Sequence, residues 1–380
     1  MLLAALLALS ACAPAPALQD PKPANLQTVL ALSVDPGFED EWFHTASEHG
    51  LRIKSVSKVV CRQPFQVYAF AVGYSVGPKG HVDLRYDIKV TRPDGTTYFE
   101  QDGLEVSVGD GIAEGNVLLA KQGIAVSFDP PDPQGEYLVH VDLHDGVAKQ
   151  SSAAEAKISL IELPEPRAFK DEEEFSAWME GYYKAAQPTR VIDAIAFAAD
   201  TGLLGGKEPS AGVSSFLRAV CKGNKFLEPL LLERFPKLTH AARLAALEIV
   251  AGAGYDQAPF LAAASEDERN EFAAHGSTAP KNPLEGTILS EDQLQEIWGI
   301  FYATGAYAPI ERVAKSLVYD EHEVEEFGDR KSAERGENLV DWSLGSNLEE
   351  PRVREYCKWM LAHERLDRAD AEALKKFLKT

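Results

Sequence analysis

Apolar and polar residues alternate along the first half of the chain. From about Leu26 to Leu163 the apolar period is mostly two, and in residues 81–90 every even position is apolar and every odd position is polar. Successive side chains of a strand point to opposite faces of a sheet, so this period predicts half-buried β-strands. Turn sequences separate further alternating runs at residues 104–108, 124–128, 137–143 and 156–161. Short strands joined by such turns are typical of an antiparallel sandwich.

One turn in this half carries a more specific signal. The sequence Asp132-Pro133-Gln134-Gly135-Glu136-Tyr137 resembles the tyrosine corner that leads into a late strand of Ig-like domains. In such a corner the hydroxyl of Tyr137 would donate a hydrogen bond to nearby backbone. We therefore expect an antiparallel Ig-like β-sandwich over residues 26–163. Residues 38–43 are the exception, because they are expected to form a short helix packed by Trp42 and Phe43.

The second half of the chain has the apolar spacing of helices. Leu163-Pro164-Glu165-Pro166 separates the halves, because two prolines so close together suit neither a continuing strand nor a helix interior. We expect a linker over residues 164–170 and an all-α domain over residues 171–380. Helices are predicted to begin at Asp171 and Pro188 and to span residues 214–220, 226–235, 240–251, 267–274, 291–303, 309–318, 333–342, 352–362 and 369–378. Their short loops indicate antiparallel helical hairpins, with a loose solenoid as the alternative.

The N-terminal residues predict where the protein resides. The apolar run over residues 1–11 is too short to span a bilayer, which needs about 20 apolar residues. It ends in Leu9-Ser10-Ala11-Cys12, which resembles the lipobox of bacterial lipoproteins. That resemblance implies a signal peptide over residues 1–11, acylation of Cys12 and a Pro-rich tether over residues 12–25. Ala13 after the cysteine favours the outer membrane, on the periplasmic side. The alternatives are a buried N-terminal helix and a misplaced start of the chain.

Net charge narrows the classes of partner. The chain has 380 residues and a formal net charge of −21 at pH 7. Nucleic acid binding is excluded on this ground, because it needs Lys and Arg to neutralise phosphates. Adsorption to anionic lipid headgroups is disfavoured for the same reason. We therefore expect the lipid on Cys12 to provide the link to the membrane. The expected partner is an envelope or secreted protein. No cofactor is expected unless a metal binds.

Three cysteines remain once Cys12 is assigned to lipid. Cys61, Cys221 and Cys357 form no C-x-x-C pair, so zinc-ribbon and thioredoxin-type sites have no support. A disulfide between Cys221 and Cys357 is one expectation, since both lie in the helical half and the periplasm is oxidising. Buried free thiols are the favoured alternative, because free Cys behaves as a small core hydrophobe.

The best candidate for metal chemistry is a group on one predicted strand. His140, Asp142 and His144 would share the polar face of that strand, opposite its apolar face. Two imidazoles and a carboxylate could hold zinc or copper if a neighbouring strand supplied support. The alternative is a solvated polar face that happens to contain two histidines. Ligands two residues apart are too far from one another to close a tight site alone.

Other motifs have a simpler interpretation. The stretch that begins at His322 has the start of a zincin motif, but Glu326 replaces its second histidine, so a solvated acidic loop or helix end is expected. Residues 201–208 lack the first glycine and the final Ser or Thr of a phosphate loop, and are expected to be a helix stop and turn. Aromatic residues of the helical half recur at spacings of three and four, which predicts core positions. Any that stay exposed would mark a groove for a partner or glycan.

Four short sequences resemble a group of uncharacterised proteobacterial envelope proteins. They are Arg92-Pro93-Asp94-Gly95, the segment from Asp132 to Tyr137, Trp298-Gly299-Ile300-Phe301-Tyr302-Ala303-Thr304-Gly305 and Trp342-Ser343-Leu344-Gly345-Ser346-Asn347. The resemblance implies the two-part architecture and brings no activity with it.

These observations favour a lipid-anchored envelope protein that binds or scaffolds another component without catalysis. No complete catalytic motif accompanies the two domain types, and fold alone does not establish function. One alternative is a metal-dependent periplasmic enzyme that uses His140, Asp142 and His144. Another is an acidic inhibitor or immunity-type protein that blocks a basic partner.

The lipid anchor is directly testable. Mass spectrometry of the purified chain is expected to find Cys12 as an acylated N-terminus, and Cys12→Ala is expected to leave the membrane fraction. Cys61→Ala, the matched control, should fractionate as the wild type does. An unmodified Met1, or a Cys12→Ala protein that still sediments with membranes, would contradict the anchor.

Overall fold

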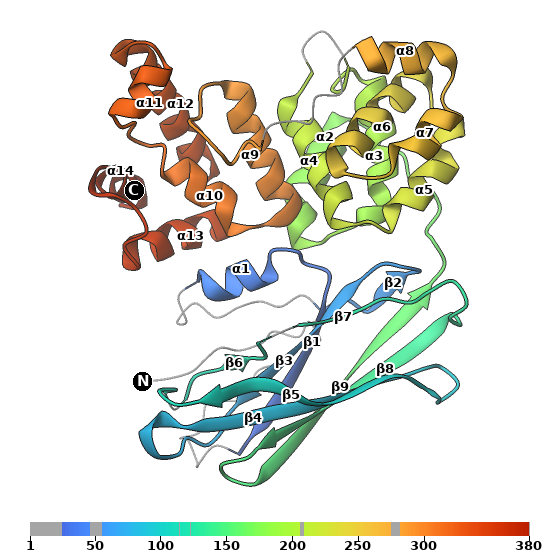
Figure 1. Ribbon diagram of the computed structural model, residues 1–380, viewed down its shortest axis with the longest axis vertical. Helices are drawn as coiled ribbons and strands as arrows, with labels where there is room; N and C mark the ends of the chain where they lie inside the picture. The colour runs from blue at the N-terminus through green and yellow to red at the C-terminus, as the bar shows by residue number, and fades with distance from the viewer. Residues whose placement is uncertain are drawn as a thin grey trace. The chain divides into compact units, whose positions relative to one another are not determined.

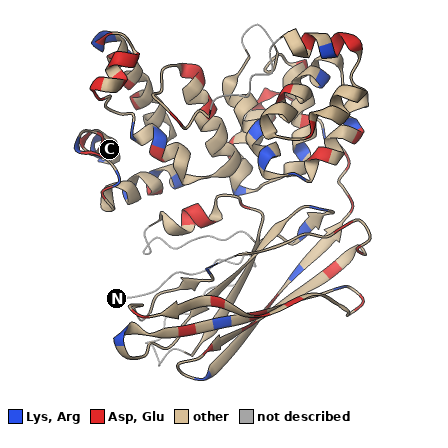
Figure 2. Ribbon diagram, viewed as in Figure 1, with Lys and Arg blue, Asp and Glu red and all other residues tan. Residues whose placement is uncertain are grey.

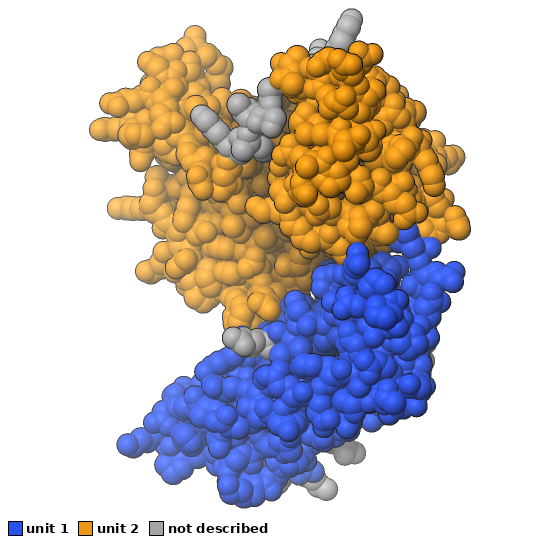
Figure 3. All heavy atoms as spheres, turned by 45° about the vertical axis from the view of Figure 1, so that its right-hand side comes forward, with its two compact units in different colours: residues 1–34, 47–163 blue, residues 35–46, 164–380 orange. Residues whose placement is uncertain are grey.

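The computed structural model describes residues 25–45, 55–113, 115–121, 123–205, 209–274 and 282–379. The signal peptide, Cys12 and most of the tether lie outside these residues. The chain divides into two compact units (Figure 3): unit 1 contains residues 1–34 and 47–163, and unit 2 contains residues 35–46 and 164–380. Unit 1 is mainly β and unit 2 is all α, as expected from the two apolar periods (Figure 1).

Unit 1 contains two β-sheets. One joins β1, β3 and β6, with β7 also paired to β3, and the other has the order β2–β9–β8–β4–β5. The strands are β1 (Gln27–Ser33), β2 (Lys58–Val60), β3 (Phe65–Val72), β4 (Val82–Thr91), β5 (Thr97–Gly109), β6 (Leu118–Leu119), β7 (Ile124–Val126), β8 (Gly135–Asp145) and β9 (Gln150–Ile161). All these pairings are antiparallel except β2 with β9, which is parallel. The prediction of a purely antiparallel domain is wrong at this edge, where a strand of 3 residues carries too little pattern to reveal its direction.

Residues of both sheets together form one hydrophobic core. Its buried side chains come from β1 and β3 in the first sheet and from β4 and β8 in the second. On β4 and β8 buried and half-exposed residues alternate, as the period of two predicts. β3 is buried along most of its length, because both of its faces meet other protein groups. Thr28 on β1 donates its hydroxyl to the Ser152 carbonyl on β9 at 2.8 Å and so ties the sheets together.

The predicted tyrosine corner is present. The hydroxyl of Tyr137 donates a hydrogen bond to the Pro133 carbonyl at 2.8 Å, and the side chain is completely buried. Its ring packs against Phe128, with 4.1 Å between the ring centroids. This contact fixes the turn that leads into β8.

Unit 2 consists of helices joined by short connections. They are α1 (Phe38–Phe43), α2 (Glu172–Gly181), α3 (Val191–Asp200), α4 (Ala211–Gly223), α5 (Leu227–Arg234), α6 (His240–Ala253), α7 (Gln257–Ala263), α8 (Glu266–Ala274), α9 (Glu291–Thr304), α10 (Tyr307–Ala314), α11 (Glu321–Glu326), α12 (Arg330–Asn347), α13 (Pro351–Ala362) and α14 (Arg368–Leu378), with 3₁₀ turns at Tyr182–Lys184, Pro188–Arg190 and Phe235–Lys237. The sequence did not predict α7, which carries a proline in its first turn, and predicted α12 too short at both ends. Among the described residues no helix combines the length and apolarity that a bilayer span requires.

Capping side chains explain where most helices of unit 2 begin. Each of these residues accepts a hydrogen bond from a backbone N–H of the first turn, which satisfies a donor that has no partner inside the helix. The caps are Asp171, Ser210, Thr239, Asp256, Ser290, Asp320, Asp329, Glu350 and Asp367. The acidic stretch at Asp320 is thus a helix start with a capping box. His322 is exposed in this helix, in agreement with the predicted solvated acidic segment.

Two glycines allow α4 and α9 to cross closely. A Cβ atom at Gly299 would lie 2.4 Å from the backbone oxygen of Gly212, a distance that real Cβ atoms do not reach. A Cβ atom at Gly212 would lie 3.2 Å from the backbone oxygen of Gln295. The hydroxyl of Ser215 also donates to the Glu296 carbonyl at 2.8 Å. A side chain at Gly299 would therefore push the two helices apart.

The short helix α1 belongs to unit 2, although the sequence placed it in the first domain. Its bounds are confirmed, but Phe38 is the buried residue, at 3% exposure, while Phe43 is 62% exposed. The carboxylate of Asp40 accepts a hydrogen bond from the Tyr307 backbone N–H at 2.9 Å. α10 has no capping side chain of its own, so Asp40 supplies the cap from a distant part of the chain.

A buried arginine holds this segment in place. The guanidinium of Arg352 on α13 pairs with the carboxylates of Asp35, at 3.0 Å, and Glu41. It also lies 4.6 Å from the ring centroid of Tyr183. Burial alone would lower the pKa of Arg352, but the two carboxylates hold it above its ordinary value. Burial also raises the pKa of Glu41, against the pull of Arg352.

Removal of this charge should destabilise unit 2. Arg352→Met would leave two carboxylates without their cation, at a cost of about 3–5 kcal/mol. All five tryptophans lie in unit 2, so denaturant unfolding followed by tryptophan fluorescence reports on this unit. Lys358→Met, on the exposed side of the same helix, is the control and should change stability by less than about 0.5 kcal/mol. Equal effects of the two substitutions would contradict this role of Arg352.

Candidate functional site

The residues predicted to bind metal lie together on β8, on its solvent face. His140 contacts Asp142 at 2.9 Å and Glu155 at 3.0 Å, each through one ring nitrogen. His144 contacts Asp87 and Ser151, both at 2.9 Å. The shared face is therefore as predicted, and both nitrogens of each ring already have a protein partner.

The hydrogen bonds of His140 favour its protonated form, which competes with metal ligation at this face. Partial burial alone would lower the pKa of His140, but its hydrogen bonds with Glu155 and Asp142 raise it above the ordinary value. A protonated imidazole has no lone pair for a metal. Within the described residues no group of three or more His, Cys, Asp or Glu side chains has the arrangement of a metal site. Metal binding by His140, Asp142 and His144 stays a prediction.

The three cysteines in the described residues are free thiols. Cys221 on α4 and Cys357 on α13 are fully buried, and burial raises the pKa of each to about 12. Cys61 lies beside the Phe128 carbonyl, and burial also raises its pKa. Thiols held in this protonated form are poor nucleophiles. The bridge between Cys221 and Cys357 that the sequence suggested is not formed in this structure.

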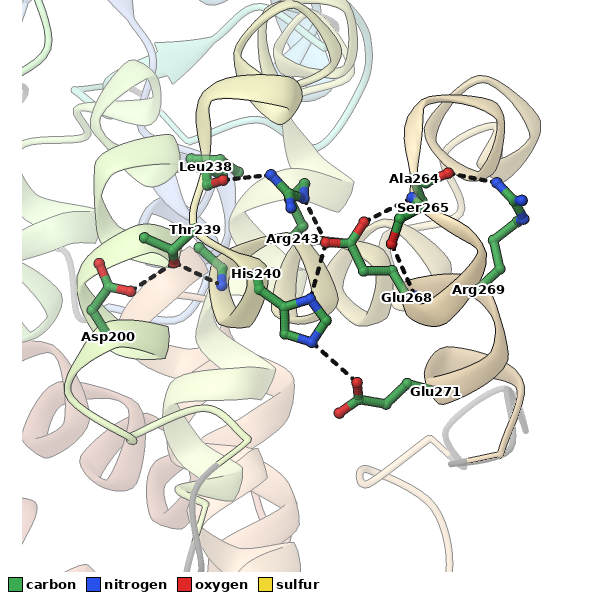
Figure 4. Close-up of polar contacts among 11 residues, drawn as sticks. Asp200, Leu238, Thr239, His240, Arg243, Ala264, Ser265, Glu268, Arg269 and Glu271 are labelled. Carbon is green, nitrogen blue, oxygen red and sulfur yellow. Dashed lines mark hydrogen bonds and ion pairs between the residues drawn. The ribbon is translucent and has the colours of Figure 1, made fainter.

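Glu268 on α8 is the centre of the polar network in Figure 4. Its buried carboxylate accepts hydrogen bonds from Arg243 at 2.7 Å and from the Ser265 backbone N–H at 2.9 Å. It also contacts His240 at 3.1 Å, whose other ring nitrogen contacts Glu271. Burial alone would raise the pKa of Glu268, but these partners hold it below its ordinary value.

This network has a structural explanation. The Ser265 hydroxyl accepts from the Glu268 N–H while Glu268 accepts from the Ser265 N–H, which is the reciprocal pattern of a capping box. Arg243 on α6 then neutralises the buried carboxylate and also donates to the Leu238 carbonyl at 2.7 Å. The contacts of Glu268 therefore start α8 and hold it on α6.

Asp370 on α14 is a buried carboxyl group with a raised pKa. Burial, followed by the nearby charge of Asp367, raises its pKa to about 7. Its side chain is 3% exposed and accepts a hydrogen bond from the Val318 backbone N–H at 3.0 Å. The buried Asp370 carboxyl therefore ties α14 to the segment that follows α10.

An open groove in unit 2 is the best candidate for a functional site. It has a volume of about 470 Å³ and lies between α2, the turn after it, α9 and the connection from α12 to α13. We call it the α2–α12 groove. The polar side chains that line it are Glu180, Lys184, Tyr302, Ser346, Asn347, Glu349 and Glu350.

Three residues of the groove, Tyr302, Ser346 and Asn347, come from the sequences that resembled envelope proteins. The hydroxyl of Tyr302 donates to the Asn347 side-chain oxygen at 2.5 Å, and burial followed by the charges of Glu180 and Glu350 raises the pKa of Tyr302 to about 12. The indole of Trp298 donates to the Ser343 hydroxyl at 2.5 Å. These contacts hold α9 against α12 and place Tyr302 and Asn347 in the wall of the groove.

Exposed Trp342 lies beside the groove. Residues four apart share one face of a helix, so Trp342 lies one turn of α12 from Ser346. The Ser346 hydroxyl donates to the Trp342 carbonyl at 2.9 Å. The Trp342 side chain is 70% exposed, whereas the other four tryptophans are buried or half-buried. The prediction that the aromatic stripes are core is wrong for Trp342.

The comparisons with known proteins assign no family. No protein-family model matches the chain, and no curated protein does. Among solved structures, part of the chain is similar to Spo0M, a sporulation control protein from Bacillus subtilis, with 12% identity over 36% of this chain and 49% of that one, at a TM-score of 0.21. A family 123 glycoside hydrolase from Clostridium perfringens is similar with 8% identity over 37% of this chain and 28% of its own, at a TM-score of 0.23.

Asp370 gives unit 2 a defined response to pH. Its folded pKa lies above the value near 3.9 of an unfolded aspartate, so its contribution to stability is present below about pH 4 and is lost as the pH rises through about 7. Asp370→Asn keeps an oxygen for the Val318 N–H without this loss. We expect the variant to gain roughly 1–3 kcal/mol over the wild type between pH 4 and pH 8. Asp292→Asn, at an exposed position, should show no such gain, and a flat difference for Asp370→Asn would contradict the assignment.

Proposed function

We propose that this chain is a lipid-anchored protein of the bacterial cell envelope, on the outer membrane facing the periplasm, that binds another protein without catalysing a reaction. The lipobox-like sequence before Cys12 supports the anchor and the location. In this proposal residues 26–163 are an Ig-like sandwich, which the Tyr137 corner supports. The helical unit then supplies the binding surface.

Exposed Trp342 is the observation that carries the binding function. A tryptophan that is 70% exposed keeps a large apolar area in water, and tryptophan side chains are enriched where proteins meet. Tryptophan is also among the residues that contribute most to protein interfaces. Its position beside an open groove provides a flat apolar contact next to a concave polar one, the arrangement expected of a recognition surface.

The polar clusters elsewhere support a non-catalytic role. His140 and His144 each have both ring nitrogens in hydrogen-bond contact, Glu268 caps α8, and Asp370 is buried. A nucleophile or a general base would need a reactive atom that a substrate can reach. Glu268 and Asp370 are buried, and the ring nitrogens of His140 and His144 are already in hydrogen-bond contact with protein groups.

Site-specific photocrosslinking tests the binding surface. A benzoylphenylalanine residue at Trp342 is expected to crosslink one discrete envelope or secreted protein in intact cells, and mass spectrometry would identify it. The same probe at exposed Glu248 on α6 is the control and should give no such product. Equal crosslinking from the two positions, or none from Trp342, would contradict the proposal.

A further inference from the structure

The side chains of the α2–α12 groove carry information about the ligand it accepts. Three of them are carboxylates, Glu180, Glu349 and Glu350, and one is an ammonium, Lys184. Lys184 pairs with Glu350, which also accepts the hydroxyl of Tyr183 and caps α13. Glu350 and Lys184 are therefore engaged within the fold. Glu180 and Glu349 are exposed and form no hydrogen bond or ion pair with the described residues.

The hydroxyl groups of the groove also face the ligand as acceptors. Tyr302 gives its proton to Asn347, and Ser346 gives its proton to the Trp342 carbonyl. The Asn347 amide nitrogen donates to the Ser343 carbonyl at 2.8 Å. These bonds use the two hydroxyl protons, so the lone pairs of Tyr302 and Ser346 and the carboxylates of Glu180 and Glu349 are left as acceptors. A ligand that donates several hydrogen bonds fits these four acceptors.

Electrostatics in the groove point the same way. Three carboxylates against one ammonium give the lining a net negative charge, and the charges of Glu180 and Glu350 add to burial in raising the pKa of Tyr302. A negative, acceptor-lined cavity favours a cation that donates several hydrogen bonds. Lysine ammonium, with three donors, and arginine guanidinium, with five, meet this requirement.

We propose that the α2–α12 groove binds a basic segment of another protein, with a lysine or arginine side chain held beside Glu180 and Glu349. Trp342, one helical turn away, packs against the neighbouring residues of that segment. A protein segment, rather than a small amine, is inferred because exposed Trp342 lies on the same helix, one turn from Ser346 of the groove, and a small amine would leave it uncovered. This inference rests on the proposed protein-binding function and specifies the chemistry of the partner.

Fluorescence anisotropy with synthetic peptides tests the inference on the full chain in detergent micelles. One probe is a labelled peptide of alternating lysine and serine, roughly ten residues long. The other is the same peptide with glutamate in place of lysine, and each spans about 33 Å when fully extended. We expect the lysine peptide to bind at about 20 mM salt and to bind more weakly at about 150 mM salt. The glutamate peptide is expected not to bind. Failure of the lysine peptide to bind would overturn the inference.

Acidic residues are spread over both units (Figure 2), so matched double variants are needed to separate the groove from the net charge of −21. Glu180→Gln with Glu349→Gln should weaken binding of the lysine peptide about tenfold or more. Glu248→Gln with Glu325→Gln removes the same charge at exposed positions on α6 and α11 and should change binding less than about twofold. Equal losses in the two variants would assign binding to net charge and overturn the groove.

Two further measurements distinguish the ways in which the inference could fail. Trp342→Ala should weaken peptide binding while unfolding of unit 2 stays unchanged, and no loss of binding would contradict the role of Trp342. Spermidine that binds as tightly as the peptide and depends on Glu180 and Glu349 would identify a small-amine site instead. If crosslinking from position 342 persists while the lysine peptide fails to bind, the protein-binding function stands and only the basic partner is wrong.

Discussion

The buried guanidinium of Arg352 is the interaction on which the organisation of unit 2 depends. It compensates Asp35 and Glu41, which come from a segment 317 and 311 positions earlier in the chain. A buried ion pair contributes little net stability over a well-packed apolar pair, but it penalises any arrangement that leaves one partner alone. Arg352 therefore acts mainly to specify which segment covers α13 and the start of α10. The cap that Asp40 provides to α10 adds a second polar requirement at the same place.

The α2–α12 groove is built on the same packing. Glu350, which closes one wall, immediately precedes the first turn of α13, and Arg352 lies within that turn. Tyr183 contacts both residues, through its hydroxyl to Glu350 and through its ring to Arg352. The contacts that fix α13 thus also fix the groove wall. A recognition surface on such a support needs little reordering when it binds, which lowers the entropic cost of binding.

Local pattern predicted much of the fold, and contacts between distant residues account for what it missed. The strand alternation, the Tyr137 corner and the bounds of α1 depend on residues close in sequence, and all three are found. The membership of α1 in unit 2 depends on a contact between residues 267 positions apart, which no local period encodes. The groove was missed for the same reason, since Glu180, Tyr302 and Glu349 lie far apart in the sequence. Trp342 has core spacing, and spacing alone cannot show that no helix covers it.

The insertion of residues 35–46 into the helical unit changes how the protein can be divided. The chain leaves the β unit after Val34, returns to it, and leaves again after Leu163. A single proteolytic cut in the linker at 164–170 would leave α1 attached to the β fragment while its side chains remain bound to the helical fragment. A recombinant fragment that begins at Pro164 would expose the surface that α1 covers and would leave Arg352 without its anions. Fragments intended to isolate the helical unit should therefore supply residues 35–46 as a separate peptide or as a fused segment.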